Sequence, residues 1–167
     1  MRKQNFLIVL CGLLISSLAL ANVKIGYVDM QKVIQSTKAG KAARKKLEAE
    51  FKKRKKELEK KQKDIQRMGK DFEKKRLALS DDVKLKKQQE LQQEMLKYQE
   101  LVGKSQMEIQ KKERELTLPI VKKARKIIQE IAKKEGYTMI LEKGQGVLWG
   151  QKDVDLTDRV IKEYDKR

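Results

Sequence analysis

The chain has 167 residues with 42 Lys or Arg and 24 Asp or Glu, so its formal net charge is +18. Because 40% of the residues are charged and only 5% are aromatic, the composition excludes a wide apolar core along the whole chain and is typical of long helices. The sequence contains no histidine and one cysteine, which excludes histidine-based catalysis, histidine metal sites and an intrachain disulfide.

Residues 1–21 have the pattern of a secretory signal peptide. Two basic residues near the amino terminus precede an apolar stretch over 6–20, and Ala19 and Ala21 form an A-x-A cleavage site. The apolar stretch is shorter than the ~20 residues that a membrane-spanning helix needs. We therefore expect cleavage after Ala21 and a mature chain that works in an exported compartment.

Residues 22–37 predict the first part of a small globular body. Apolar and other residues alternate over 23–28, which is the pattern of a strand, and residues 30–35 fit a short helix. The apolar residues of this strand are Val23, Ile25 and Tyr27.

Residues 38–118 predict two long helices that fold back on each other as an antiparallel hairpin. Apolar residues recur at intervals of seven in each helix, which is the pattern of a coiled-coil seam. The predicted seam comprises Phe51, Leu58, Ile65, Phe72, Met95, Val102, Ile109 and Leu116. The spacing pairs Phe51 with Leu116 and Phe72 with Met95. Ser80, followed by two aspartates, fits the start of the second helix and places the tip at about residues 80–85.

The hairpin carries most of the excess positive charge. Residues 38–79 contain 18 basic and 7 acidic side chains, and residues 38–135 account for +15 of the +16 of the mature chain. The densest basic run contains Lys52, Lys53, Lys55 and Lys56. Solubility alone is met by balanced charges, so the excess indicates an anionic partner, which could be nucleic acid, lipid headgroups or acidic protein.

Residues 119–167 predict the remainder of the body. Pro119 lies inside the helical pattern, where a proline kinks a helix, and we place the boundary with the hairpin there. Gly136 fits the end of the helix. A denser apolar stripe follows the proline and comprises Ile120, Ala124, Ile127 and Ile131.

Two further strands and a last helix are expected after Gly136. The strands are predicted at 137–142, with Met139 and Leu141 among their apolar residues, and at 147–149. The last helix is expected to begin with Thr157 as its N-cap.

The sequence shows no catalytic constellation. Gly144, Gly146 and Gly150 do not have the spacing of a dinucleotide-binding loop. A calcium loop starting at Asp153 would lack its required glycine and glutamate. We therefore expect a protein that is not an enzyme and that holds no cofactor or metal.

The order of these features resembles the Skp/OmpH family of periplasmic chaperones. The resemblance covers the mature chain and is carried by residues 24–33 (KIGYVDMQKV), the Lys-rich hairpin, Pro119-Ile120, Gly136-Tyr137, Ile140-Leu141-Glu142 and Asp155-Leu156-Thr157. It implies a trimer whose strands form a central body and whose three hairpins hang as tentacles around a cavity. Members of this family hold unfolded outer-membrane proteins in that cavity without ATP.

The sequence therefore predicts an α+β fold, in which a long antiparallel coiled-coil hairpin projects from a small β body that completes itself by trimerisation. The short strands of one chain make a poor sheet with open edges, which favours pairing between chains. The residues expected at the trimer contact are Val23, Ile25, Tyr27, Met139 and Leu141.

We expect a periplasmic, ATP-independent holdase that binds unfolded outer-membrane proteins and captures them with Lys52, Lys53, Lys55 and Lys56. An anionic lipid surface is a further candidate partner. One alternative is an exported basic coiled coil that binds anionic envelope polymers, although no wall-binding motif is present. The other is a nucleic-acid-binding coiled coil. The export signal and the lack of a basic strand with interleaved aromatic residues count against physiological nucleic acid.

Overall fold

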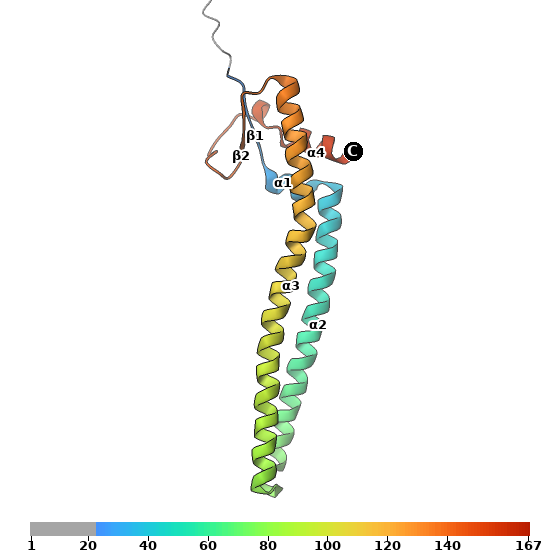
Figure 1. The fold of residues 1–167 in the computed structure, drawn as a ribbon, viewed down its shortest axis with the longest axis vertical. Helices are drawn as coiled ribbons and strands as arrows, with labels where there is room; N and C mark the ends of the chain where they lie inside the picture. Colours follow the sequence, from blue (N-terminus) through green and yellow to red (C-terminus); the bar gives the residue numbers. More distant parts are fainter. Residues whose placement is uncertain (1–22) are drawn as a thin grey trace, which may run out of the picture.

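The computed structural model describes residues 23–167 as a long two-helix hairpin that projects from a small body (Figure 1). The predicted signal peptide, with Ala19 and Ala21, lies outside the described residues. The elements in chain order are β1 (Ile25–Val28), α1 (Met30–Ser36), α2 (Lys38–Lys75), a 3-10 turn η1 (Arg76–Ala78), α3 (Asp81–Glu135), β2 (Met139–Glu142), a 3-10 turn η2 (Lys152–Val154) and α4 (Thr157–Lys166).

The body is built around two parallel strands. β1 pairs with β2 in a register that sets Ile25 beside Met139 and Tyr27 beside Leu141. Parallel strands need a long crossover, and here the crossover contains the whole hairpin. Val28 is buried and Ile140 packs against the core, so one face of the sheet covers the helices of the body.

The core of the body lies between this sheet and the helices α1, α3 and α4. The four apolar residues predicted to follow Pro119 as a stripe are all buried in it. Val33 of α1 and Val160 of α4 are fully buried beside them. Hydrogen bonds tie the two ends of the chain together: the backbone N–H of Asp29 donates to Thr157 Oγ1 at 2.9 Å, and that of Leu156 to the Tyr27 carbonyl at 2.9 Å.

Two expectations for the carboxy-terminal segment are wrong. The strand predicted at 147–149 is absent: Val147 makes one isolated bridge to Lys143, and the side chains of Leu148 and Trp149 are exposed. The short apolar run resembles a strand, but it meets no partner strand among residues 23–167. Thr157 is the first residue of α4 and not its N-cap. Its hydroxyl accepts a hydrogen bond from the N–H of Asp29, and its own N–H donates to Asp155 Oδ1 at 2.9 Å.

Pro119 does not end or interrupt the helix that contains it. α3 runs through this residue as one helix from Asp81 to Glu135 and ends at Gly136, which has the left-handed backbone conformation expected of a C-cap (φ 70°). Pro119 lies on the exposed side, and Ile120 beside it is buried in the body. A proline removes only one helical hydrogen bond, and packing on the opposite side keeps the helix continuous.

The hairpin forms as predicted, but its tip and its register differ from the expectation. α2 ends at Lys75 and α3 begins at Asp81, so the chain turns back before residues 80–85. Arg54 contacts Glu108, and a Cβ on Gly69 would lie 4.0 Å from Leu91. The second helix is therefore displaced by more than a turn from the predicted pairing.

The predicted seam residues differ in how deeply they are buried. Of the eight predicted seam residues, Phe72 is buried and Leu58, Ile65, Ile109 and Leu116 are half-buried. Phe51, Met95 and Val102 are exposed, although Phe51 and Val102 still lie along the line where the two helices meet. Arg54 and Lys61, which form ion pairs with acidic residues of α3, share the contact between the helices with the apolar residues.

Candidate functional site

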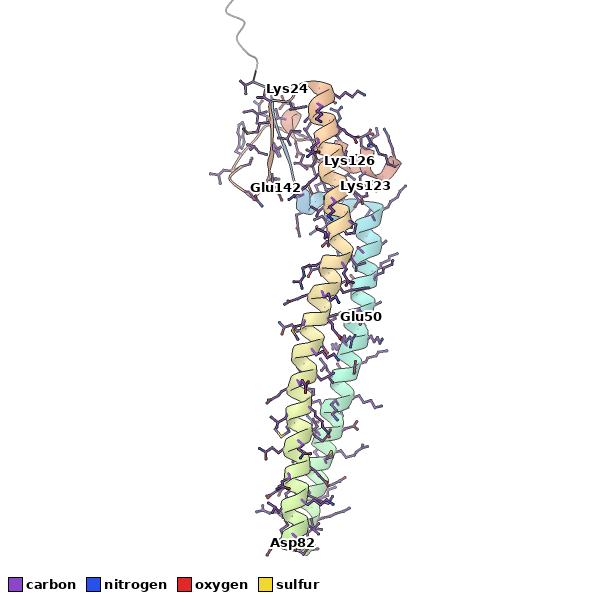
Figure 2. All side chains as sticks on the ribbon, viewed as in Figure 1. Lys24, Glu50, Asp82, Lys123, Lys126 and Glu142 are labelled. Carbon is purple, nitrogen blue, oxygen red and sulfur yellow. The ribbon has the colours of Figure 1, made fainter. Side chains whose placement is uncertain are left out.

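The candidate functional surface is the hairpin, whose positive charge lies on one of its two helices. α2 carries 17 basic and 7 acidic side chains, whereas residues 81–118 of α3 carry 8 of each. Figure 2 shows these side chains projecting into solvent along the hairpin, from near the body to Asp82 at the free end. The hairpin thus presents a basic face and a neutral face.

The four lysines predicted to capture a partner all lie exposed on α2. Within residues 23–167, Lys55 is the one member of this set that lies within 4 Å of a carboxylate, that of Glu59 at 3.8 Å. An exposed ion pair of this length contributes little stability and is screened by salt. The positive charge of this run is therefore available to an external anionic group.

Ion pairs between the helices fix the hairpin where apolar contacts are missing. The guanidinium of Arg54 lies 2.8 Å from Glu108 of α3 and 2.9 Å from Glu50 of its own helix. The hydrogen bond to Glu50 and the charge of Glu108 both raise the pKa of Arg54. Glu50 is labelled in Figure 2, at the level of this contact.

Nearer the tip, Lys61 of α2 forms an ion pair with Glu94 of α3. Lys97 donates to the other oxygen of Glu94 at 2.9 Å. These two hydrogen bonds lower the pKa of Glu94 to about 2. The seven-residue apolar repeat does not reveal that Arg54 and Lys61 make contacts between the helices. It missed Glu94 and Glu108, which could have been found by searching the second helix for acids able to face them.

The body carries a second exposed surface, which is apolar. Ile25, Met139 and Leu141 lie on the face of the two-stranded sheet that points away from the core, with exposures of 45%, 52% and 39%, and Val23 is 60% exposed. Trp149 adjoins Ile25 and Leu141 around one cavity. An exposed apolar surface on a short sheet is typical of a contact with another chain.

Tyr27 does not belong to that exposed surface. It is buried against Gly150 of its own chain and lines the same cavity as Ile25 and Leu141, so its part in a contact between chains stays a prediction. A Cβ on Gly150 would lie 2.5 Å from the Tyr27 ring, which shows how closely the loop crosses it. Burial and the nearby Asp155 raise the pKa of Tyr27.

Residues 23–167 contain neither a membrane-spanning helix nor a cluster of metal-binding side chains. No helix in this part of the chain is long and apolar enough to cross a membrane. No group of three or more acidic, Cys or His side chains in the same range is arranged to hold a metal ion.

Comparison with known proteins identifies a family and a solved structure that this chain resembles. A solved structure described as a candidate outer membrane chaperone (OmpH-like) from Caulobacter crescentus CB15 matches with a TM-score of 0.75 at 18% identity, over 86% of this chain and 84% of that chain. A comparison with curated protein sequences found no match. The model of the family described as outer membrane protein (OmpH-like) matches residues 24–164. The chain therefore belongs to the OmpH-like family.

Proposed function

We propose that this protein is an ATP-independent periplasmic holdase, which binds unfolded outer-membrane proteins and prevents their aggregation on the way to the outer membrane. The observation that carries the proposal is the OmpH-like match over residues 24–164. The chaperone description of the Caulobacter structure supports the same role, as does the signal-peptide pattern of residues 1–21.

The hairpin has properties suited to this task. An unfolded chain offers scattered charges and apolar side chains without a fixed shape. Exposed lysines on α2 attract acidic segments over a distance, and exposed apolar side chains such as Phe51 and Met95 then provide short-range contacts. Many weak contacts spread along a hairpin allow a client to be bound and later released.

We further propose that the working form is a homotrimer held together by the exposed face of the body. Ile25, Met139, Leu141 and Val23 would be covered in that assembly, because their exposure in one chain leaves a two-stranded sheet with one bare face. Three hairpins would then hang from one body and enclose the client.

The test mixes the mature protein with an outer-membrane β-barrel protein diluted from urea. We expect suppressed light scattering by the barrel, and a soluble complex whose mass equals three chains plus one barrel. Parallel samples contain duplex DNA or lipopolysaccharide in place of the barrel. Strong binding of either polymer with no suppression of barrel aggregation would reject the proposal in favour of an envelope-polymer or nucleic-acid binder.

A further inference from the structure

An open, mainly apolar groove lies between α2 and α3. It has a volume of about 390 Å³ and lies between residues 51–62 of α2 and 98–110 of α3. Its apolar lining comprises Phe51, Leu58, Tyr98, Val102 and Ile109.

The groove exists because the coiled-coil contact is incomplete at this level. Arg54 spans the two helices to reach Glu108, and Ser105 places a short side chain where a large apolar residue would fill the gap. Phe51 and Val102, whose spacing predicts that they close the seam, stand at the margins with 57% and 37% exposure. Side chains that could have sealed the hairpin therefore line an opening.

One polar atom inside the groove has no partner. Ser105 is 4% exposed, and its Oγ is buried and makes no hydrogen bond within the described chain. A buried hydroxyl without a partner is destabilising, and such groups are rare in folded proteins. A hydroxyl in an apolar groove suits a ligand that is apolar along its length and polar at its tip.

We propose that this groove is an anchor site for one Tyr or Trp side chain of an extended, acidic client segment, with the Ser105 hydroxyl bonding the phenol or indole tip. This inference rests on the proposed holdase function and names the client feature that the hairpin recognises. Tyr and Trp are large apolar side chains with one polar group, which usually finds a hydrogen-bond partner when buried.

Charge and client chemistry both favour this occupant. The exposed Lys55 lines the α2 side of the groove, so an acidic residue beside the aromatic anchor would meet positive charge. Strands of membrane-spanning β-barrels alternate apolar and polar residues and carry girdles of aromatic residues at both interfaces. An unfolded barrel therefore presents Tyr and Trp in extended segments at many points along its chain.

The experiment uses the mature chain and an acidic, extended host peptide labelled with fluorescein, with Trp, Tyr, Phe or Leu at one guest position. Fluorescence anisotropy measures each dissociation constant. We expect the Tyr peptide to bind about fivefold more tightly than the Phe peptide, since the two differ by one hydrogen bond. Ser105→Ala should remove this difference and leave binding of the Phe peptide unchanged.

Two further variants test the groove itself. Ser105→Leu fills it and should weaken binding of all aromatic peptides about tenfold, with helicity retained. Phe51→Ala removes an exposed margin residue, so it leaves folding unaffected and should also weaken the aromatic peptides. The matched control is Leu96→Ala, which removes a similarly exposed apolar side chain of α3 outside the groove and should change nothing.

Equal affinity of the unmodified protein for Tyr and Phe peptides, or wild-type affinity in both Ser105→Leu and Phe51→Ala, would overturn the proposal. So would failure of the unmodified protein to bind any aromatic peptide. These outcomes are distinct from failure of the holdase function, which is judged by barrel aggregation with the unmodified protein alone.

Discussion

At the corner between α1 and α2, one residue must be glycine for steric reasons. Thr37 is fully buried there and caps α2 by accepting a hydrogen bond from the N–H of Gly40 at 3.2 Å. A Cβ on Gly40 would lie 1.5 Å from the carbonyl oxygen of Ile34, which is backbone and cannot rotate away. The corner that joins the body to the hairpin therefore depends on the missing side chain.

We expect Gly40→Ala to lower the free energy of unfolding by about 3 kcal/mol, the upper end of the usual cost of overpacking, because α1 must shift to admit the methyl group. Gly103→Ala is the matched control. It lies inside α3 with nothing within 4 Å of its Cβ, and should stabilise the protein by about 0.5–1 kcal/mol through helix propensity. Urea unfolding of both variants checks the prediction, and equal midpoints would contradict it.

Glu94 makes the stability of the hairpin dependent on pH. Its pKa in the folded chain is about 2, below its ordinary value of 4.5, so the unfolded chain takes up a proton more readily than the folded one. The stabilisation is fully present above pH 4.5 and is lost as the pH falls from there towards 2.

Amide hydrogen exchange around residues 90–98 should therefore become faster between pH 4.5 and 2, beyond the change expected from exchange chemistry alone. Glu94→Gln should remove most of this additional change. Glu100→Gln, an exposed residue of the same helix, is the control and should respond as the unmodified chain does. If the two variants behave alike, the two lysine contacts of Glu94 do not stabilise the hairpin.

At the scale of elements, the two helices are joined most firmly near the tip. Phe72 is the one large apolar side chain of α2 that is buried, and it lies beside Met68 and Leu91. Elsewhere between the body and the tip, ion pairs and half-buried residues make the contact. The hairpin therefore depends on a few residues and not on a continuous core.

Phe72→Ala should loosen this end of the hairpin at a cost of about 3 kcal/mol, the low end for loss of a buried Phe. Hydrogen exchange should accelerate around residues 65–95, with the body unaffected. Met107→Ala, an exposed apolar residue of α3, serves as the control and should have no effect. Uniform protection of residues 40–130 in the unmodified chain would contradict the view of a weak seam.

The existence of these elements could be predicted from the sequence, but the way they meet could not. A seven-residue repeat reveals a long helix with one apolar stripe, and Gly136 marks its end. The repeat does not reveal the register, because Arg54 and Lys61 select it through acids on the other helix. The missing strand at 147–149 has a different cause. Apolar residues indicate a preference for pairing, whereas among residues 23–167 Val147 makes only one isolated bridge, to Lys143.

At the scale of the whole molecule, the proposed trimer depends on the exposed face of the body. We expect Ile25→Asp to convert trimers into monomers, because burying an unpaired charge at a chain contact costs several kcal/mol. Leu96→Asp makes the same change on an exposed residue of the hairpin and should leave the mass unchanged. Light scattering gives the mass of each variant. A folded monomer in the unmodified protein would exclude this assembly.

The basic face of α2 should govern how fast a client is captured. Replacing Lys52, Lys53, Lys55 and Lys56 by Gln should slow association with an acidic unfolded barrel several-fold at low salt, and should mimic the effect of adding salt, because screening acts over about 8 Å at physiological ionic strength.

Stopped-flow association rates test this electrostatic mechanism. The matched control replaces Lys122, Lys126, Lys133 and Lys134, four exposed lysines at the body end of α3, and should slow capture much less. Rates that depend on neither salt nor the four α2 lysines would show that the excess charge serves solubility only.

The pairing of β1 with β2 sets the order in which the chain can fold. Ile25 pairs with Met139, which lies more than 110 positions later in the chain. β1 can therefore form its hydrogen bonds with β2 only after most of the chain has been synthesised. The helices form from local contacts and are available early, whereas closure of such a long loop is slow. We therefore expect the hairpin to form before the body that carries it. A chain truncated after Glu135 would keep two helices and leave β1 without a partner. During synthesis from the amino terminus, β1 is complete long before β2 appears.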